Sequence, residues 1–321
     1  MSALEGLNPG LWSEDTASLR ALEQRLLDLW GGRGFAEVVP PLLLPEAQAL
    51  AASSEALSSR TLKLQANGDG PLALRSDFTA GVAWMVSRRY RTLEAPLRVS
   101  YSGAVLRRPT PDRPEGLETL QGGCERVSPA AGLEGDEEML RLAAESLLAL
   151  GVKDPVLELG HWGLVGPLMD RMAWPAEGRA ALESALNRKS SSALTALSGR
   201  FGQSSELALL GDLLHLGGRP EAVDALGPRL RTAGVMAVWV RVRELGALLE
   251  REFPKLAVRL EPTDVRHWSY YTGLTVKAFA PGHPFAVLSG GRYDGLYPAL
   301  GRPFGAFGFA VHLGRLLEKE G

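Results

Sequence analysis

The sequence predicts an α+β fold in which an antiparallel sheet is flanked by helices. One observation is the strict alternation of apolar and polar side chains over residues 96–106, which is typical of a half-buried strand. Another is a pair of strand patterns over 274–279 and 285–288, close enough in the chain to form a hairpin. A third is the helical spacing of leucines after Ser13 and after Asp136.

The composition is that of an ordinary globular protein. The chain has 321 residues, of which 45% are apolar and 22% are charged, enough for one large domain or two modest ones. A net charge of −2 gives no support for nucleic acid as the main partner. The single cysteine, Cys124, excludes a disulfide framework, so we expect a reducing, cytoplasmic location.

Several kinds of site are missing from the sequence. The five histidines are scattered, and none has a neighbour at metal-ligand spacing, so no metal site is expected. Neither a phosphate-binding loop nor a dinucleotide fingerprint is found, so no cofactor is predicted. The first residues lack a signal-peptide pattern, and no apolar run is long enough to span a bilayer. We therefore expect no membrane partner.

The first quarter of the chain reads as a helix followed by strands. After an irregular lead-in over 1–12, Ser13 or Asp15 is expected to cap a helix that glycines end. The apolar face of this helix consists of Leu19, Leu22, Leu26, Leu29 and Trp30. Residues 35–41 then form a strand closed by prolines, and residues 61–65 form a short strand that turns into the next one.

A second helix is expected from Asp77 to about Arg91. Asp77 permits two interpretations at this point. Its carboxylate can cap the helix by accepting backbone N–H groups, or it can bind a ligand. One side chain serves only one of these roles well.

Residues 96–125 form a strand, a loop and a returning strand. Three prolines and a glycine make residues 107–116 a loop. Residues 117–125 then return beside the first strand. This antiparallel pair is the most regular strand pattern in the chain.

The sequence then becomes helical. Asp136 is expected to cap a helix that reaches Leu150 and ends at Gly151. Residues 176–230 are rich in Ala, Leu, Arg and Glu at helical spacing and read as a helical insertion between core elements. The remaining predicted elements are a strand over 156–159, a helix over 165–172, a helix over 235–250 and a strand over 256–260.

The C-terminal stretch has the most distinctive pattern in the chain. Its three glycine-rich blocks are residues 265–273, 289–296 and 305–316. The pair Gly290–Gly291 allows two backbones to approach closely. We expect a hairpin that carries Tyr271 and Tyr293, with Arg266 and Arg315 at its flanks.

These three blocks resemble the two histidine signature segments and the third class motif of histidyl-tRNA synthetase, in the same order. The helix and strand over 13–41 resemble the first motif of class II synthetases, which forms their dimer interface. Residues 96–125 resemble the second motif. The resemblance implies a class II aminoacyl-tRNA synthetase-like fold, organised as one core domain over 1–321 with a helical insertion at about 176–230.

Most positions that bind ATP in this family, called the nucleotide half below, carry other residues in this chain. In the family's second motif an arginine holds the α-phosphate, a glutamate reads the adenine amino group and a phenylalanine stacks on the base. Arg107 keeps the first position, but Pro109 and Thr119 replace the other two. Loss of the stacking ring weakens ATP binding by roughly 1–3 kcal/mol. An adenine amino group without a hydrogen-bond partner weakens it by a further ~1–3 kcal/mol. In the third motif, His312 replaces a glycine and Gly314 replaces a glutamate.

The amino-acid half is largely retained. Asp77 and Thr79 lie where the family's carboxylate and threonine hold the amino group of histidine. The resemblance implies that Gln121 also takes the amino group, Arg266 the carboxylate, and Glu125 with two tyrosines the imidazole. The histidine-like pocket would consist of Asp77, Thr79, Arg107, Gln121, Glu125, Arg266, Tyr271 and Tyr293. Two interpretations stay open: the pocket binds histidine, or it is a vestige and the effector binds at a subunit interface.

The chain ends five residues after Leu316, where an anticodon-binding domain follows in histidyl-tRNA synthetase. A core of this kind with damaged nucleotide motifs resembles the regulatory subunits of ATP phosphoribosyltransferase. That resemblance implies a non-catalytic protein that activates the short-form catalytic subunit in the first step of histidine biosynthesis. It also implies feedback inhibition by histidine, a self-dimer through the N-terminal helix-strand element, and no tRNA partner.

Two other functions are compatible with the sequence. Arg107, Arg266 and Arg315 survive at phosphate-handling positions, so the rival function is a stand-alone ligase that adenylates histidine or a similar amino acid. Histidine-dependent exchange between ATP and pyrophosphate separates this ligase from a regulatory subunit. The other alternative is a scaffold that only holds an oligomer together.

Overall fold

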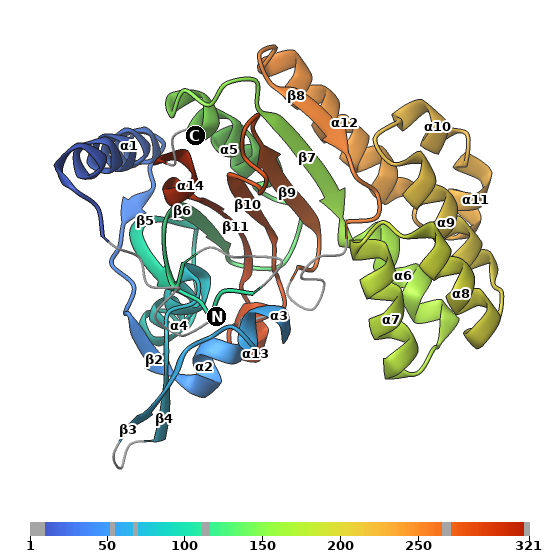
Figure 1. Cartoon of the computed structure of the whole chain (residues 1–321), viewed down its shortest axis with the longest axis horizontal. Coiled ribbons are helices and arrows are strands. Elements are labelled where there is room, and N and C mark those ends of the chain that lie inside the picture. The colour runs from blue at the N-terminus through green and yellow to red at the C-terminus, as the bar shows by residue number, and fades with distance from the viewer. Residues whose placement is uncertain (1–9, 52–54, 67–69, 111–115, 265–270, 318–321) are drawn as a thin grey trace.

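An eight-stranded sheet forms the centre of the molecule (Figure 1). The computed structural model describes residues 10–51, 55–66, 70–110, 116–264 and 271–317. In spatial order the strands are β1 (Ala36–Glu37), β5 (Leu97–Leu106), β6 (Glu118–Ser128), β11 (Gly305–Val311), β10 (Leu288–Arg292), β9 (Leu274–Phe279), β7 (Val156–His161) and β8 (Ala257–Leu260). Neighbouring strands are antiparallel, except that β1 is parallel to β5 and β7 to β8. The predicted fold class is confirmed.

A smaller sheet of three antiparallel strands extends from one corner of the molecule, at the lower left of Figure 1. Its strands, in spatial order, are β2 (Leu43–Pro45), β4 (Gly70–Leu74) and β3 (Lys63–Ala66). Two short helices, α2 (Glu46–Ala51) and α3 (Glu55–Ser58), lie between β2 and β3 in the chain. The strand predicted over 61–65 therefore exists, shifted toward its C-terminal end.

Helices cover both faces of the central sheet and create two hydrophobic cores. On one face, α1 (Ser13–Gly32), α5 (Asp136–Ala149) and α12 (Met236–Glu252) pack against the inward side chains of β7, β9 and β11. On the other face, α4 (Phe78–Arg89) and α13 (Leu296–Ala299) pack against β5 and the smaller sheet. The short α14 (Leu313–Leu317) follows β11. The candidate site lies on the α4 face.

A helical lobe projects beyond β7 and β8, on the right of Figure 1. After α6 (Trp162–Met172), the segment predicted as a helical insertion forms α7 (Ala176–Asn187), α8 (Ser191–Phe201), α9 (Ser205–Leu216), α10 (Pro220–Asp224) and α11 (Gly227–Thr232). Buried leucines from α7, α8 and α9 meet inside the lobe, while arginine–carboxylate pairs such as Arg229–Asp212 lie on its surface.

Two predicted helix caps are wrong. The N-cap of α1 is Trp12, which makes no side-chain cap, so neither Ser13 nor Asp15 has that role. The N-cap of α5 is Gly135, in a left-handed conformation with φ of 85°. Asp136 is instead the first helical residue, because its carboxylate forms a buried ion pair with Arg292, at 2.6 Å from Nη2 to Oδ1. A buried guanidinium needs an anionic partner more than a helix end needs a side-chain cap.

Two predicted strands are displaced. The strand expected over 35–41 is reduced to β1, since only two residues pair with β5. The strand expected over 285–288 begins at Leu288, and β10 runs through the glycine pair that follows. A Cβ atom on Gly290 would lie 2.3 Å from the carbonyl oxygen of Gly308, so close packing of β10 on β11 requires this glycine.

Across the part of the chain that the structure describes, none of the helices has the length and apolar character needed to cross a lipid bilayer.

Candidate functional site

The carboxylate of Glu125 lies at the centre of the candidate site. Glu125 is on β6 and is fully buried. The hydroxyl groups of Thr79 and Tyr101 donate to its Oε1, at 2.8 and 3.0 Å, and the hydroxyl of Tyr293 donates to its Oε2. These three donors come from α4, β5 and the end of β10. Segments far apart in the sequence therefore meet at one carboxylate.

Three glycines on neighbouring strands make room for these side chains. Gly308 on β11 is directly opposite Glu125, and a Cβ there would lie 1.6 Å from Glu125 Oε2. A Cβ on Gly123 would lie 2.6 Å from the hydroxyl of Tyr101. A Cβ on Gly291 would lie 2.9 Å from the ring of Tyr271. The glycines let large polar side chains lie flat on the sheet.

Burial makes the Glu125 carboxyl a weaker acid than an exposed glutamate. The pKa of Glu125 is raised to about 7, chiefly by desolvation and in part by the negative charge of Asp77, against the opposing effect of the three hydroxyl donors. Burial, together with the charges of Glu125 and Asp77, also raises the pKa of Tyr271. Two carboxylates therefore share one desolvated region, which is an environment that favours a cationic ligand.

Asp77 is the N-cap of α4, as one of the two sequence interpretations proposed. Its Oδ1 accepts the backbone N–H of Ala80 at 3.1 Å. Burial raises the pKa of the Asp77 carboxyl, while this backbone hydrogen bond and the charge of Arg107 lower it. The ligand role of Asp77 stays a prediction.

Gln121 has a partner that the sequence did not indicate. Its Nε2 lies 3.0 Å from Nδ1 of His312, and Nε2 of the same imidazole lies 3.1 Å from Oγ of Ser289. Gln121 is only 2% exposed. His312, which replaces a glycine of the family's third motif, therefore joins β6 to β10 across the end of β11.

The arginines of the nucleotide half are held by backbone carbonyls. Arg107 donates from Nε to the carbonyl oxygen of Ser76, at 2.5 Å. Arg315 donates to the carbonyl oxygen of Ala286, and its guanidinium lies 5.5 Å from the ring centre of Phe285. Arg266, a third arginine in the sequence prediction, lies outside the described residues.

Seven of the eight predicted site residues can thus be placed. Four of them, Asp77, Thr79, Tyr271 and Tyr293, bond or interact electrostatically with a fifth, Glu125, and Arg107 interacts with Asp77 and Tyr271. Gln121 lies four residues before Glu125 on β6 and on the same face. Sequence reasoning missed Tyr101 and Ser289. The sequence did contain an indication for Tyr101, because strand alternation places its side chain on the face that meets Gly123 across the β5–β6 pair.

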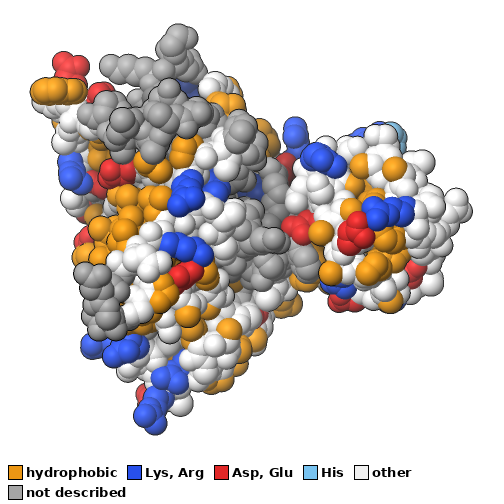
Figure 2. Space-filling model, turned by 60° about the horizontal axis from the view of Figure 1, so that its bottom comes forward, with side chains coloured by type: hydrophobic (Ala, Val, Ile, Leu, Met, Phe, Trp, Pro, Cys, Tyr) orange, Lys and Arg blue, Asp and Glu red, His pale blue; other side chains and the backbone are white. Residues whose placement is uncertain are grey.

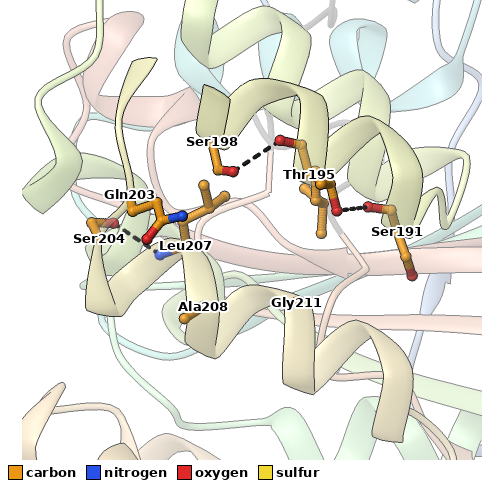
Figure 3. A pocket seen from close by; sticks show the side chains of 9 residues that line it. Ser191, Thr195, Ser198, Gln203, Ser204, Leu207, Ala208 and Gly211 are labelled. Carbon is orange, nitrogen blue, oxygen red and sulfur yellow. Dashed lines mark hydrogen bonds between the residues drawn. The ribbon is translucent and has the colours of Figure 1, made fainter. Parts of the chain in front are cut away.

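A separate groove lies on the helical lobe, between α8 and α9 (Figure 3). Its volume is about 410 Å³, and it is lined by Ser191, Leu194, Thr195, Ser198, Gln203, Ser204, Leu207, Ala208 and Gly211. Several of its hydroxyls bond within the lobe, for example Ser204 Oγ to the backbone N–H of Leu207 at 3.0 Å. The groove contains none of the predicted site residues.

Comparisons with known proteins bear on the fold and the family of the chain. The family model described as histidyl-tRNA synthetase matches residues 11–316. An ATP phosphoribosyltransferase regulatory subunit from Moorella thermoacetica is 35% identical over 314 residues, which cover 96% of this chain and 79% of that protein. A crystal structure from Bacillus halodurans, titled as an ATP phosphoribosyltransferase regulatory subunit/histidyl-tRNA synthetase, has a TM-score of 0.83 at 25% identity, covering 98% of this chain and 81% of the other.

A second solved structure gives the fold in an assembly. It is titled as the ATP phosphoribosyl transferase (HisG:HisZ) complex from Thermotoga maritima. It has a TM-score of 0.65 at 19% identity, covering 93% of this chain and 97% of the other. At that identity the likeness concerns the fold alone.

Proposed function

The chain belongs to the family of ATP phosphoribosyltransferase regulatory subunits, which share the fold of histidyl-tRNA synthetase, and on that premise we propose that the Glu125 site is its histidine-sensing pocket. The chain is a regulatory subunit in histidine biosynthesis, and catalysis belongs to another subunit. In our proposal this chain activates a short-form catalytic subunit and transmits feedback inhibition by histidine.

The observation that carries this proposal is a pair of buried carboxylates among hydroxyl donors. Glu125 and Asp77 are both desolvated, which raises the pKa of each carboxyl, and the charge of Asp77 adds to the rise at Glu125. A ligand bearing an ammonium group and an imidazole N–H offers donors to both carboxylates. In this pocket Asp77, Thr79 and Gln121 take the ammonium group. Glu125 with Tyr271 and Tyr293 takes the imidazole, and the family resemblance assigns the carboxylate to Arg266, which lies outside the described residues.

The nucleotide half supports regulation over ligase chemistry. Thr119 on β6 offers no ring for stacking, and Pro109 offers no side-chain hydrogen bond to adenine. The imidazole of His312 is engaged with Gln121 and Ser289, and Arg315 is engaged with Ala286. A stand-alone ligase needs the missing ring and hydrogen-bonding group for adenine, a glycine in place of His312 and an arginine at position 315 that can reach ATP, so the ligase alternative is not favoured.

Feedback requires that histidine bind one arrangement of the assembly more tightly than another. A ligand shifts an equilibrium between two states only by its differential affinity for them. The Glu125 site joins α4, β5, β6 and β10, so a ligand there contacts several elements at once. We propose that histidine stabilises the arrangement in which the catalytic partner is less active.

Self-association through the N-terminal helix-strand element, α1 and β1, is the second part of the proposal, and the smaller sheet that follows in the chain also exposes apolar side chains. Leu43 and Leu64 lie on the outer face of the smaller sheet and are 43% and 42% exposed, and Val39 beside β1 is 84% exposed. Figure 2 shows hydrophobic side chains gathered on the left of the molecule, the side where Figure 1 has these strands. Exposed apolar side chains that gather on one side of a molecule are typical of a protein–protein interface. We also propose that the partner is the short-form catalytic subunit and that the protein is cytoplasmic.

Calorimetric titration of the full chain with L-histidine tests the pocket. We expect binding by the unaltered chain, and about 10-fold to 100-fold weaker binding by Asp77→Asn, which keeps the helix cap but loses the charge. Asp212→Asn on the surface of α9 is the matched control and should bind normally. Absence of heat for the chain alone, with histidine inhibition intact in the complex with the catalytic subunit, would place the effector site at the subunit interface.

A second assay separates the function classes. We expect the chain to raise the transferase activity of the catalytic subunit and to give no histidine-dependent exchange between ATP and pyrophosphate. Exchange would support the ligase. If the chain did not change the transferase activity, the remaining function would be that of a scaffold that only holds an oligomer together.

A further inference from the structure

His312 lies in the same row of side chains as the site. In the antiparallel pairing of β11 with β6, Gly308 is opposite Glu125 and Ala310 is opposite Gly123. Side chains two residues apart share one face of a strand, so the next member of this row on β11 is His312, beside Gln121. The row therefore has the Glu125 carboxylate at one end and the Gln121–His312 pair at the other.

The hydrogen bonds of His312 fix the roles of its two ring nitrogens. In a neutral imidazole one nitrogen donates and the other accepts. The amide Nε2 of Gln121 can only donate, so His312 Nδ1 accepts this bond over 3.0 Å. Nε2 of His312 then carries the proton and donates to Ser289 Oγ over 3.1 Å. The backbone holds the ring in place, because the N–H of His312 donates to the carbonyl oxygen of Val287 at 2.8 Å.

The other polar atom of the same amide is the carbonyl oxygen of Gln121. With Nε2 of Gln121 committed to His312, its carbonyl Oε1 is directed away from the imidazole, and among the described residues it accepts no hydrogen bond. Gln121 is 2% exposed, and its Oε1 is not one of the fully buried side-chain atoms that lack a hydrogen bond, so this oxygen stays open to a ligand. A glycine at position 312 would leave the amide free to rotate by half a turn and present its NH₂ group instead.

We infer that His312 is a positioning residue that orients the Gln121 amide so that its oxygen faces an ammonium group of the ligand. The inference rests on the proposed histidine pocket and adds a selectivity rule to it. Ligands with an α-ammonium group bind, and analogues without this group are rejected. The imidazole at position 312 thereby contributes to amino-acid recognition at a place where it also fills space that a nucleotide would need.

The test compares two ligands that differ only in the ammonium group. L-histidine and imidazole-propionic acid are titrated into the full chain by calorimetry. We expect His312→Gly to reduce the preference for L-histidine by about 10-fold to 100-fold, because an amide N–H replaces an oxygen beside the ammonium. His312→Asn should restore much of the preference, because its side-chain oxygen can accept from Gln121. A purely structural role for His312 predicts equal losses for both ligands and would overturn the inference.

A spectroscopic measurement tests the tautomer directly. In the unaltered chain, ¹⁵N spectra of the histidine side chains, with His312→Asn used for assignment, should show a pyridine-like Nδ1 and a pyrrole-like Nε2 for His312. The opposite tautomer would mean that Gln121 presents its NH₂ group, and the inference would be wrong. If the unaltered chain binds L-histidine but the ligand preference is the same in all variants, only this inference fails. If the unaltered chain binds no histidine, the proposed pocket fails with it.

Discussion

Two buried carboxylates, Glu125 and Asp136, differ in what surrounds them. Asp136 is 1% exposed and is paired with Arg292, whose Nε and Nη2 both donate to its Oδ1, at 2.9 and 2.6 Å. Glu125 is 0% exposed, and its partners among the described residues are the hydroxyls of Thr79, Tyr101 and Tyr293. From the residues that the structure describes, Asp136 receives a full counter-charge and Glu125 receives only dipoles.

The difference separates a structural site from a binding site. The guanidinium of Arg292 also donates to the carbonyl oxygen of Glu134, so this cluster ties β10 to the start of α5 and needs nothing further. Hydroxyl donors stabilise the charge of Glu125 only in part, and the pKa of about 7 reflects that shortfall. A cationic ligand would supply the missing counter-charge.

The largest effect is expected at the structural carboxylate. Asp136→Ala leaves the buried guanidinium of Arg292 without its counter-charge and should lower the free energy of unfolding by about 3–5 kcal/mol. Urea denaturation measures this loss. Histidine affinity of the fraction that remains folded should be unchanged, because the ion pair does not contact Glu125. A loss below 1 kcal/mol would contradict the assignment of this pair to the fold.

Replacing Glu125 should change how the stability of the chain depends on pH. The folded pKa of Glu125, about 7, lies above its ordinary value of 4.5, so the folded state holds a proton that the unfolded state releases in that window. Stability therefore falls as pH rises from 4.5 to 7, by about 3 kcal/mol in total, and is level above pH 7. Glu125→Gln should remove this part of the pH dependence and abolish histidine binding. Denaturation curves for both chains across this range measure the difference, and parallel curves would contradict it.

Sequence patterns predicted the parts of the fold that local physics controls. The alternation over 96–106 gave β5 to within one residue, since a half-buried strand repeats every two side chains. The cap assigned to Asp136 was wrong because its partner, Arg292, is 156 residues away. Likewise, nothing near His312 in sequence indicates that its ring bonds Gln121, 191 residues earlier. The packing of α5 on the sheet creates the first contact, and register across the sheet creates the second.

A glycine substitution tests whether the Glu125 site is closely packed. In Gly308→Ala the new methyl would lie 1.6 Å from Glu125 Oε2, so the carboxylate must move and its hydrogen bonds must lengthen. We expect a loss of about 1–3 kcal/mol in stability, together with loss of histidine binding. The matched control is Gly199→Ala on α8, where a Cβ meets no atom within 4 Å. That change should stabilise the chain by about 0.5–1 kcal/mol and leave binding intact. Normal histidine affinity in Gly308→Ala would show that the ligand site lies elsewhere.

The smallest effect should come from restoring one element of the nucleotide half. Thr119→Phe returns a ring at the position that stacks on adenine in histidyl-tRNA synthetase, and stacking is worth about 1–3 kcal/mol per base. We expect a gain near the lower limit, about fivefold in ATP affinity, because Pro109 still leaves the adenine amino group unread and His312 stays bonded to Gln121. Histidine affinity should not change, since Thr119 does not touch Glu125. Equilibrium binding of a fluorescent ATP analogue measures the gain. If this one ring also restored histidine-dependent pyrophosphate exchange, the two halves of the site would still be coupled as in a ligase, and the contrast between a retained amino-acid half and a lost nucleotide half would not hold.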